Sequence, residues 1–171
     1  MILYDQKIYD LIMKLYSENA TLIFKIFTSI GSTLVIITGI ISILILFGKK
    51  EFKYMSIACS VGIIFVTILK NIIRRPRPSV FRLTYETGYS FPSSHTTMST
   101  IFYGLLIYLI WKKVKNNKLK YFLTYIFILI IIGVGMSRIY LGVHYATDVT
   151  AGIIIGIIYD ILFIKLLKEK A

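Results

Sequence analysis

The run SRIYLGVHYATD, residues 137–148, joins two long apolar segments and carries an arginine, a histidine and an aspartate. If a helix begins near His144, then His144 and Asp148 are one helical turn apart and share a face. A carboxylate in that position fixes the tautomer of the imidazole and stabilises the cation that forms when the other ring nitrogen reacts. Arg138 precedes a turn at Gly142 and is expected to reach toward the same ring. These three side chains at the edge of an apolar segment indicate phosphate chemistry.

The overall composition indicates a polytopic membrane protein. Apolar residues make up 57% of the 171 residues, and they form long continuous runs. In a membrane protein, a net charge such as +12 usually reflects basic cytoplasmic loops, so the positions of the charges matter more than their sum. No soluble basic face for a nucleic-acid partner is visible. Cys59 is the single cysteine and lies in an apolar run, so we expect neither a disulfide framework nor a thiolate metal site.

The apolar runs predict an all-α fold, a polytopic membrane helical bundle of one domain over residues 1–171. Five transmembrane spans are predicted, at residues 26–47, 54–69, 96–111, 121–137 and 149–164. Residues 1–25 place apolar side chains at helical spacing between charged ones, which predicts an N-terminal interfacial amphipathic helix. The alternative is that this segment crosses the membrane as a sixth span. The bundle of residues 26–171 carries the motifs described below.

Lysines identify one end of the predicted bundle as cytoplasmic. They follow the first, third and fifth spans, and they are Lys49, Lys50, Lys53, Lys112, Lys113, Lys115, Lys118, Lys120, Lys165, Lys168 and Lys170. Cytoplasmic loops are enriched in such residues. Arginines at the opposite end go against this bias, and an anionic substrate would explain them. We therefore expect a multi-pass protein of the cell membrane whose site faces the extracytoplasmic side.

Three polar segments are expected to meet at that opposite end, because they lie at the ends of spans two and four and at the starts of spans three and five. Their sequences are KNIIRRPRP (70–78), SFPSSHTT (90–97) and the run 137–148. All three prolines of the chain, Pro76, Pro78 and Pro92, lie between the first two segments or within them. This pattern predicts an ordered loop over residues 74–94.

The three segments contain the motifs Lys-x6-Arg-Pro, Pro-Ser-x-His and Ser-Arg-x5-His-x3-Asp. The motif positions are Lys70, Arg77, Pro78, Pro92, Ser93, His95, Ser137, Arg138, His144 and Asp148. In this order they resemble the three signatures of the type 2 phosphatidic acid phosphatase superfamily, a family of integral-membrane lipid phosphatases. One difference is Ser94, where many members have glycine. A small residue still permits close approach to phosphate.

The resemblance implies a role for each motif residue. It implies that His144 is the nucleophile and forms a phosphohistidine, that Asp148 orients His144, and that His95 protonates the leaving oxygen. It implies that the phosphate is bound by Lys70, Arg77, Ser93, Ser94 and Arg138. It also implies that the reaction uses no metal and no cofactor.

Elementary chemistry agrees with these roles. Phosphoryl transfer needs neutralisation of the equatorial oxygens and in-line positioning. Arginine supplies a planar fork for two oxygens, lysine adds a point charge, and helix starts direct N–H groups toward an anion. A two-step covalent route needs one group that attacks and one that gives and then takes a proton. The chain has two histidines, and both lie in the motifs.

The predicted function is metal-independent hydrolysis of a phosphate or diphosphate on a membrane lipid, through a phosphohistidine intermediate at the extracytoplasmic face of the lipid bilayer. Undecaprenyl diphosphate is the leading substrate, because a small single-domain chain resembles bacterial undecaprenyl-diphosphate phosphatases. Phosphatidate or phosphatidylglycerophosphate is the alternative. A non-catalytic module that binds or transports phospholipid is the rival class, and a vanadate-dependent oxidase is a third option. Arg74, Arg75 and Arg82 lie outside the motif spacing and are expected to be headgroup or surface contacts.

Overall fold

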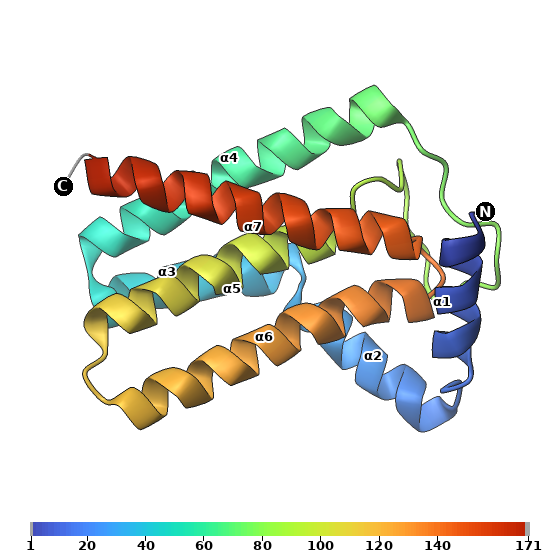
Figure 1. Ribbon diagram of the computed structural model, residues 1–171, viewed down its shortest axis with the longest axis horizontal. Helices are drawn as coiled ribbons and strands as arrows, with labels where there is room; N and C mark the ends of the chain where they lie inside the picture. Colours follow the sequence, from blue (N-terminus) through green and yellow to red (C-terminus); the bar gives the residue numbers. More distant parts are fainter. Residues whose placement is uncertain (1, 170–171) are drawn as a thin grey trace.

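The structure is a computed structural model that describes residues 2–169, and its regular secondary structure is entirely helical. Seven helices follow one another over these residues (Figure 1). Their bounds are α1 Leu3–Met13, α2 Glu18–Ile30, α3 Thr33–Phe47, α4 Lys49–Ile73, α5 Ser94–Lys113, α6 Asn117–Tyr140 and α7 Ala146–Glu169. Helices α4 to α7 run along the long axis of the bundle, and α1 lies across one end (Figure 1). The expectation of an all-α bundle is confirmed.

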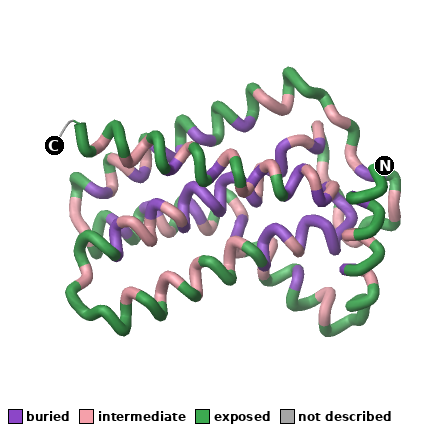
Figure 2. Tube along the Cα trace, in the orientation of Figure 1, coloured by how far each residue is buried: buried purple, intermediate pink, exposed green. Residues whose placement is uncertain are grey.

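Helix α5 lies inside the bundle, in contact with α3, α4, α6 and α7. Every residue from Thr96 to Tyr103 is buried, which Figure 2 shows as an almost unbroken run. Two of its buried hydroxyls are satisfied within the helix, because Thr97 Oγ1 and Thr100 Oγ1 each donate to the carbonyl four residues earlier. The buried Ser99 Oγ has no hydrogen-bond partner among the described residues. A helix that is surrounded by others can therefore carry polar residues at its start, where the site is built.

Helix α7 packs closely on α5 through its small residues. A Cβ atom at Gly156 would lie 2.6 Å from Thr100 Cβ, and a Cβ at Gly152 would lie 3.0 Å from Thr97 Oγ1. These distances leave no room for a side chain without movement of α5 or α7. Gly152 and Gly156 continue the row of His144 and Asp148, so the close contact fixes the element that carries Asp148.

The N-terminal segment differs from the predicted single helix over residues 1–25. It forms α1 and α2, because Ser17 starts a new helix by accepting a hydrogen bond from Ala20 N at 3.1 Å. Helix α2 then continues past residue 25 to Ile30, and a 50° bend separates it from α3. Ser32 caps α3 at this bend, and Gly31 lies where a Cβ would be 2.6 Å from Val134 Cγ1. The predicted boundary at residue 25 and the unbroken span 26–47 are therefore wrong.

Several helices have the length and composition of membrane spans. Among the described residues, α4, α6 and α7 satisfy both criteria, and α2 with α3 forms a fourth candidate if the bent pair counts as one span. Their outer faces expose large aliphatic side chains, such as Ile64 and Ile68 on α4 and Ile154 and Ile161 on α7. Contiguous exposed apolar surface of this kind is typical of contact with lipid.

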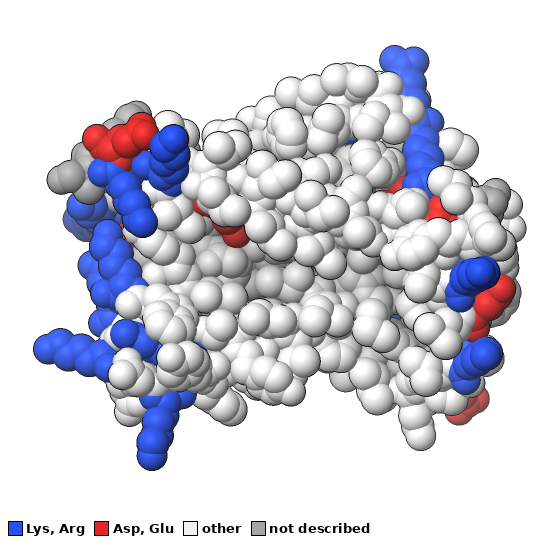
Figure 3. Space-filling model, in the orientation of Figure 1, with Lys and Arg blue, Asp and Glu red and all other residues white. Residues whose placement is uncertain are grey.

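Most of the visible charges are gathered at the two ends of the bundle, with a largely apolar belt between them that shows one small acidic patch (Figure 3). The end with the α3–α4 and α5–α6 turns carries a dense group of lysines, which includes Lys49, Lys50, Lys112 and Lys113. Lys113 Nζ lies 2.7 Å from Glu51 Oε1 at this end. The opposite end holds α1 and the loop of residues 74–93 (Figure 1). The lysines that follow the first, third and fifth predicted spans therefore lie at the end away from the motif-bearing loop, as predicted, for those that the structure describes; Lys170 lies outside the described residues.

Replacing Gly156 by Val should destabilise the bundle, because the new side chain would overlap Thr100 in α5. We expect a loss of about 1–3 kcal/mol in the free energy of unfolding, the usual range for overpacking. Thermal unfolding of the detergent-purified protein measures it. The control is Ile158→Val on the exposed face of the same helix. Equal unfolding midpoints for the two variants would contradict the close packing of α5 and α7.

Candidate active site

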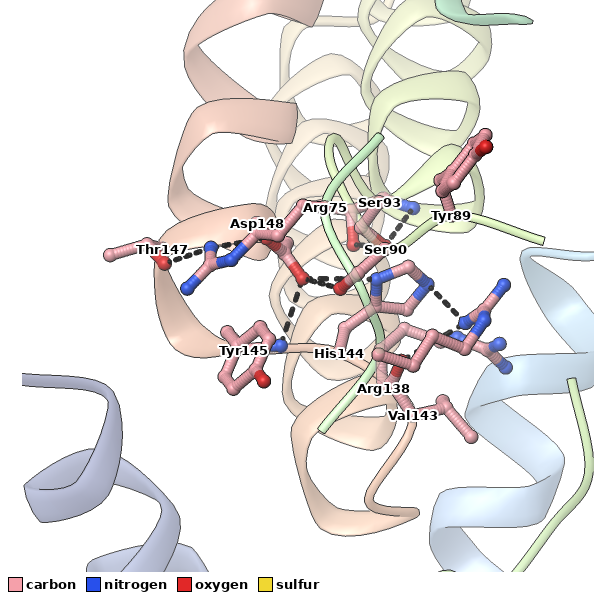
Figure 4. A network of polar contacts seen from close by, with 12 residues as sticks. Arg75, Tyr89, Ser90, Ser93, Arg138, Val143, His144, Tyr145, Thr147 and Asp148 are labelled. Atoms are coloured by element: carbon pink, nitrogen blue, oxygen red, sulfur yellow. Dashed lines mark hydrogen bonds and ion pairs between the residues drawn. The ribbon is translucent and has the colours of Figure 1, made fainter. Parts of the chain in front are cut away.

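The three predicted segments meet at the end of the bundle where α1 lies. Backbone hydrogen bonds join them: Ser90 N donates to Arg75 O at 2.8 Å, and Ser93 N donates to Asp148 O at 3.2 Å. The loop is also tied to the turn between α6 and α7, because Leu83 N donates to Leu141 O at 3.1 Å. The loop after α4, the start of α5 and the start of α7 thus surround one site (Figure 4). The predicted convergence is confirmed.

His144 lies in the turn just before α7, not in its first turn as expected, because α7 begins at Ala146. It is 3% exposed. Its Nδ1 lies 3.4 Å from Asp148 Oδ2, and its Nε2 lies 3.2 Å from Arg77 Nη1 (Figure 4). A guanidinium can only donate, so Nε2 accepts and the ring proton is on Nδ1, facing the carboxylate. This tautomer leaves the lone pair of Nε2 directed at a cation.

The position of His144 also sets its charge. Burial lowers the pKa of its imidazole to about 4, and the nearby charges of Arg138, Arg77 and Lys70 act in the same direction, although the hydrogen bond to Asp148 opposes them. The ring is therefore neutral at neutral pH. A neutral imidazole with one unprotonated ring nitrogen is a competent nucleophile.

Asp148 is fully buried, and both of its carboxylate oxygens have partners. Oδ1 accepts from Arg75 Nη1 at 2.6 Å. Oδ2 accepts from Tyr145 N at 3.0 Å and from the Ser90 hydroxyl, in addition to its contact with His144. These bonds hold the carboxylate beside Nδ1 of His144, as expected for an orienting residue.

Lys70 and Arg77 are held by backbone carbonyls of the loop. Lys70 Nζ donates to Tyr89 O at 2.7 Å. Arg77 Nη2 donates to Thr87 O at 2.7 Å, and its Nη1 donates to Val143 O at 3.0 Å. Burial lowers the pKa of Arg77 from its ordinary value, but an arginine guanidinium keeps its proton in proteins and therefore stays charged. The hydrogen bonds to Thr87 O and Val143 O fix the guanidinium of Arg77 beside Nε2 of His144.

Arg138 is 1% exposed and is paired with a carboxylate that the motifs do not include. Its Nη2 lies 2.5 Å from Glu86 Oε1, and its Nη1 donates to Thr28 Oγ1. Glu86 Oε2 also lies 3.9 Å from Arg77 Nη2. Burial alone would raise the pKa of Glu86, but the hydrogen bond and charge of Arg138 hold it below its usual value. An anionic oxygen thus already lies between two of the predicted phosphate-binding cations.

The start of α5 brings the remaining predicted residues to the site. The Ser93 side chain caps the helix, with Oγ 2.9 Å from Thr96 Oγ1. Ser94 and His95 line a cavity of about 330 Å³ whose other walls come mainly from α3 and α4. These walls are mostly apolar and include Ile36, Ile40 and Ile63. His95 is within electrostatic reach of Arg138, Glu86 and His144.

Sequence reasoning missed two residues that contact Asp148. Arg75 was expected at the surface, but it is paired with Asp148. The sequence Arg-Pro-Arg-Pro at residues 75–78 places Arg75 two positions before the motif residue Arg77 in the same proline context, and this was a usable signal. Ser90 lies at the start of a quoted segment, and no signal marked its hydroxyl. Arg74 and Arg82 are exposed and bond to nearby backbone carbonyls, as expected of residues outside the site.

Comparisons with known proteins agree with this geometry. The sequence profile described as the PAP2 superfamily matches residues 51–171. Phosphatidylglycerophosphatase B of Bacillus subtilis (strain 168) is 36% identical over 107 residues, which are 60% of this chain and 51% of that protein. Undecaprenyl-diphosphatase BcrC of the same organism is 29% identical over 122 residues, which are 68% of this chain and 58% of that protein. The chain thus matches a little over half the length of these curated relatives.

A solved structure gives a longer match. It is the crystal structure of a transmembrane PAP2 type phosphatidylglycerolphosphate phosphatase from Bacillus subtilis. The TM-score is 0.88 at 26% identity, and the match covers 97% of this chain and 85% of that chain. With the apolar outer faces of the helices, this likeness identifies a multi-pass membrane protein.

The buried environment of His144 predicts its titration. We expect the ring to take up a proton near pH 4 and not near 6.5. Nitrogen NMR of isotope-labelled histidine in the His95→Gln variant, which leaves His144 as the single histidine, measures this value. The unfolded chain binds that proton near 6.5, so the free energy of unfolding should fall as the pH drops from about 6.5 toward 4. A His144 midpoint near 6.5 would contradict the burial and cation contacts described above.

Proposed function

The chain belongs to the PAP2 superfamily, and on that premise we propose that it is a membrane lipid phosphatase that hydrolyses a phosphate or diphosphate on a lipid. The observation that carries the proposal is the geometry of His144. Its Nδ1 faces Asp148 and its Nε2 lone pair faces Arg77, at 3.4 Å and 3.2 Å respectively. A reactive nitrogen directed at a group of cations is the arrangement that attack on a phosphorus atom requires.

The first chemical step forms a phosphohistidine. Nε2 of His144 attacks the phosphorus, and the bond from phosphorus to the leaving oxygen breaks, which is the lipid oxygen in a monoester and the bridging oxygen in a diphosphate. Protonated His95 gives its proton to that oxygen. The Nδ1 proton stays on the ring, and Asp148 stabilises the positive charge that develops there. In the second step a water attacks the phosphorus and gives a proton to His95. The P–N bond then breaks, which returns neutral His144 and releases inorganic phosphate.

The cations stabilise the phosphoryl oxygens during both steps. Arg77 and Arg138 already hold Glu86 between them, and a phosphate would take the place of its carboxylate and of the Arg77 contact with Nε2. Lys70 adds a third positive charge, and the backbone at Ser94 and His95 lies at the start of α5, where N–H groups favour an anion. The proposed reaction uses no metal and no cofactor, as the family resemblance implies.

A lipid substrate is supported by the cavity beside His95. Its apolar walls belong to α3 and α4, which also expose aliphatic side chains on their outer faces. An acyl or prenyl chain could lie there while its phosphate reaches His144. The five-span arrangement, with the lysine-rich end cytoplasmic and the site extracytoplasmic, is part of this proposal.

The similarities favour a phosphatidylglycerophosphate-type substrate over undecaprenyl diphosphate, which led on sequence alone. The two Bacillus subtilis proteins with those activities in their names are 36% and 29% identical to this chain. Phosphatidate is the third candidate substrate. A module that only binds phospholipid would have no use for the pairing of Asp148 with His144 or for a second histidine.

The proposal is tested by phosphate release from detergent-purified protein. Phosphatidylglycerophosphate, undecaprenyl diphosphate and phosphatidate are compared with EDTA present, and His144→Ala is the blank. We expect EDTA-resistant release that disappears in the blank, with the rank order naming the substrate. Absence of release from all three by folded protein would favour the binding module. Loss of release on adding EDTA would contradict the metal-independent route.

Arg77 and Arg82 give a matched pair for the role of the cations, since both belong to the loop and both bond to backbone carbonyls. Arg77→Ala should lower kcat/KM by about 100-fold or more, because a fixed donor to the phosphoryl oxygens is lost. Arg82→Ala should change it by less than about twofold, since its side chain is directed to Pro78 O and the solvent. Similar losses from the two variants would overturn the assignment of Arg77.

A further inference from the structure

Asp5 is a buried carboxylate on α1, outside all three motifs. It is 1% exposed. Its Oδ1 accepts from Thr147 N at 2.8 Å and from Thr147 Oγ1 at 2.9 Å, and its Oδ2 accepts from Arg75 Nη2 at 2.9 Å. A buried charge with this many partners is a built feature of the fold.

Arg75 connects Asp5 to the active site. One of its terminal nitrogens, Nη2, donates to Asp5, and the other, Nη1, donates to Asp148 Oδ1 at 2.6 Å and to Thr147 Oγ1 at 2.6 Å. The guanidinium also lies 4.0 Å from the centre of the Tyr145 ring (Figure 4). A planar fork between two carboxylates has little freedom to turn. The position of Asp148 Oδ1 therefore depends on where Asp5 holds Arg75.

Asp5 also acts on the helix that carries Asp148. Thr147 is in the first turn of α7, where backbone N–H groups lack partners within the helix. By accepting from Thr147 N, Asp5 caps α7 from a different helix. The contact places a negative charge at the helix start, which is favourable, and it fixes the residue next to Asp148.

The sharing of Arg75 has an electrostatic consequence. Asp5 takes part of the attraction of this guanidinium, so Asp148 keeps negative charge available for the Nδ1 proton of His144. Without the Asp5 charge, Asp148 would be the one carboxylate paired with Arg75, and Arg75 would be free to shift and carry Oδ1 with it. The carboxylate would then turn relative to His144, where the present contact is 3.4 Å.

We propose that Asp5 is a positioning residue of the active site, which acts through Arg75 and Thr147 to hold Asp148 against Nδ1 of His144. Helix α1 is then part of the catalytic apparatus and not only a surface helix. Its apolar residues Ile8, Tyr9 and Ile12 pack in one cluster with Leu141 and Val143 of the α6–α7 turn and with Ala146 at the start of α7. This docking brings Asp5 to the start of α7. The inference rests on the proposed role of His144 as the nucleophile.

The variant Asp5→Asn tests the inference, because asparagine keeps the shape and the acceptor for Thr147 N and removes the charge that balances Arg75. We expect kcat to fall about tenfold while KM stays within about twofold, since an orienting contact is weakened and the phosphate-binding cations are untouched. The matched control is Asp10→Asn, an exposed aspartate on the same helix that bonds to Gln6, for which kcat should be unchanged.

A spectroscopic readout separates positioning from simple anchoring of α1. Nitrogen NMR of labelled histidine at neutral pH should show His144 as the Nδ1–H tautomer in the wild type and as a mixture of tautomers in Asp5→Asn. A lower unfolding temperature with kcat and tautomer unchanged would overturn the inference. If Asp5→Asn does not fold, Arg75→Lys is used, since lysine keeps the charge but cannot bridge both carboxylates. The same mixture of tautomers is then expected, and an unchanged tautomer overturns the inference.

Different results would contradict the lipid phosphatase function and the positioning role of Asp5. Absence of phosphate release by the wild type would count against the lipid phosphatase function, whatever Asp5 does. The tautomer of His144 still decides whether Asp5 positions Asp148 in that case, because the measurement needs no substrate.

Discussion

A buried carboxylate needs hydrogen bonds on both of its oxygens, and at Asp148 this requirement organises the whole site. An unpaired charge at this depth would cost more free energy than the local packing could offset. Its partners come from each segment that meets there: Arg75 and Ser90 from the loop after α4, and Tyr145 N and His144 from the turn before α7. Three distant parts of the chain are held together because one acid has to be satisfied. The same contacts fix the tautomer of the adjacent imidazole.

Burial of the site affects the charge of its histidine and of its cations differently. The bundle excludes water from His144, which keeps the ring neutral, while the cations around it stay charged because arginine keeps its proton even when desolvated. Glu86 lies between Arg138 and Arg77 and satisfies them when no phosphate does. One side of the site therefore carries the cations and suits an anion. The other side opens to the apolar cavity lined by α3 and α4 and suits an apolar chain.

Much of this arrangement follows from local sequence. Long apolar runs predicted the helices, and the motif spacing predicted that His144 and Asp148 meet and that Lys70, Arg77 and His95 gather at one end of the bundle. The small residues Gly152 and Gly156 also permit the close approach of α7 to α5. For His144 with Asp148 and for Gly152 with Gly156, the signal lies in residues four positions apart on one helical row. The gathering of Lys70, Arg77 and His95 follows instead from the alternation of the spans, which brings their ends to one side.

What the sequence did not predict depends on contacts between distant residues or on single turns. The pairing of Arg75 with Asp5 and Asp148 joins residues about 70 positions apart. The sequence around each of these residues contains no pattern that predicts the contact. The break before α2 and the bend after it depend on the caps at Ser17 and Ser32, which are weak signals among apolar neighbours. The start of α7 at Ala146 was missed by two residues, because the turn at Gly142 continues through His144.

The central claim is that His144 forms a covalent bond to phosphorus. The most direct measurement is rapid quenching of the purified protein during turnover of a lipid labelled in its phosphate, followed by identification of the labelled peptide. The account predicts an acid-labile, base-stable label on the peptide that contains His144, and no label in His144→Asn. Turnover without any labelled protein, or with label on another residue, would contradict the account.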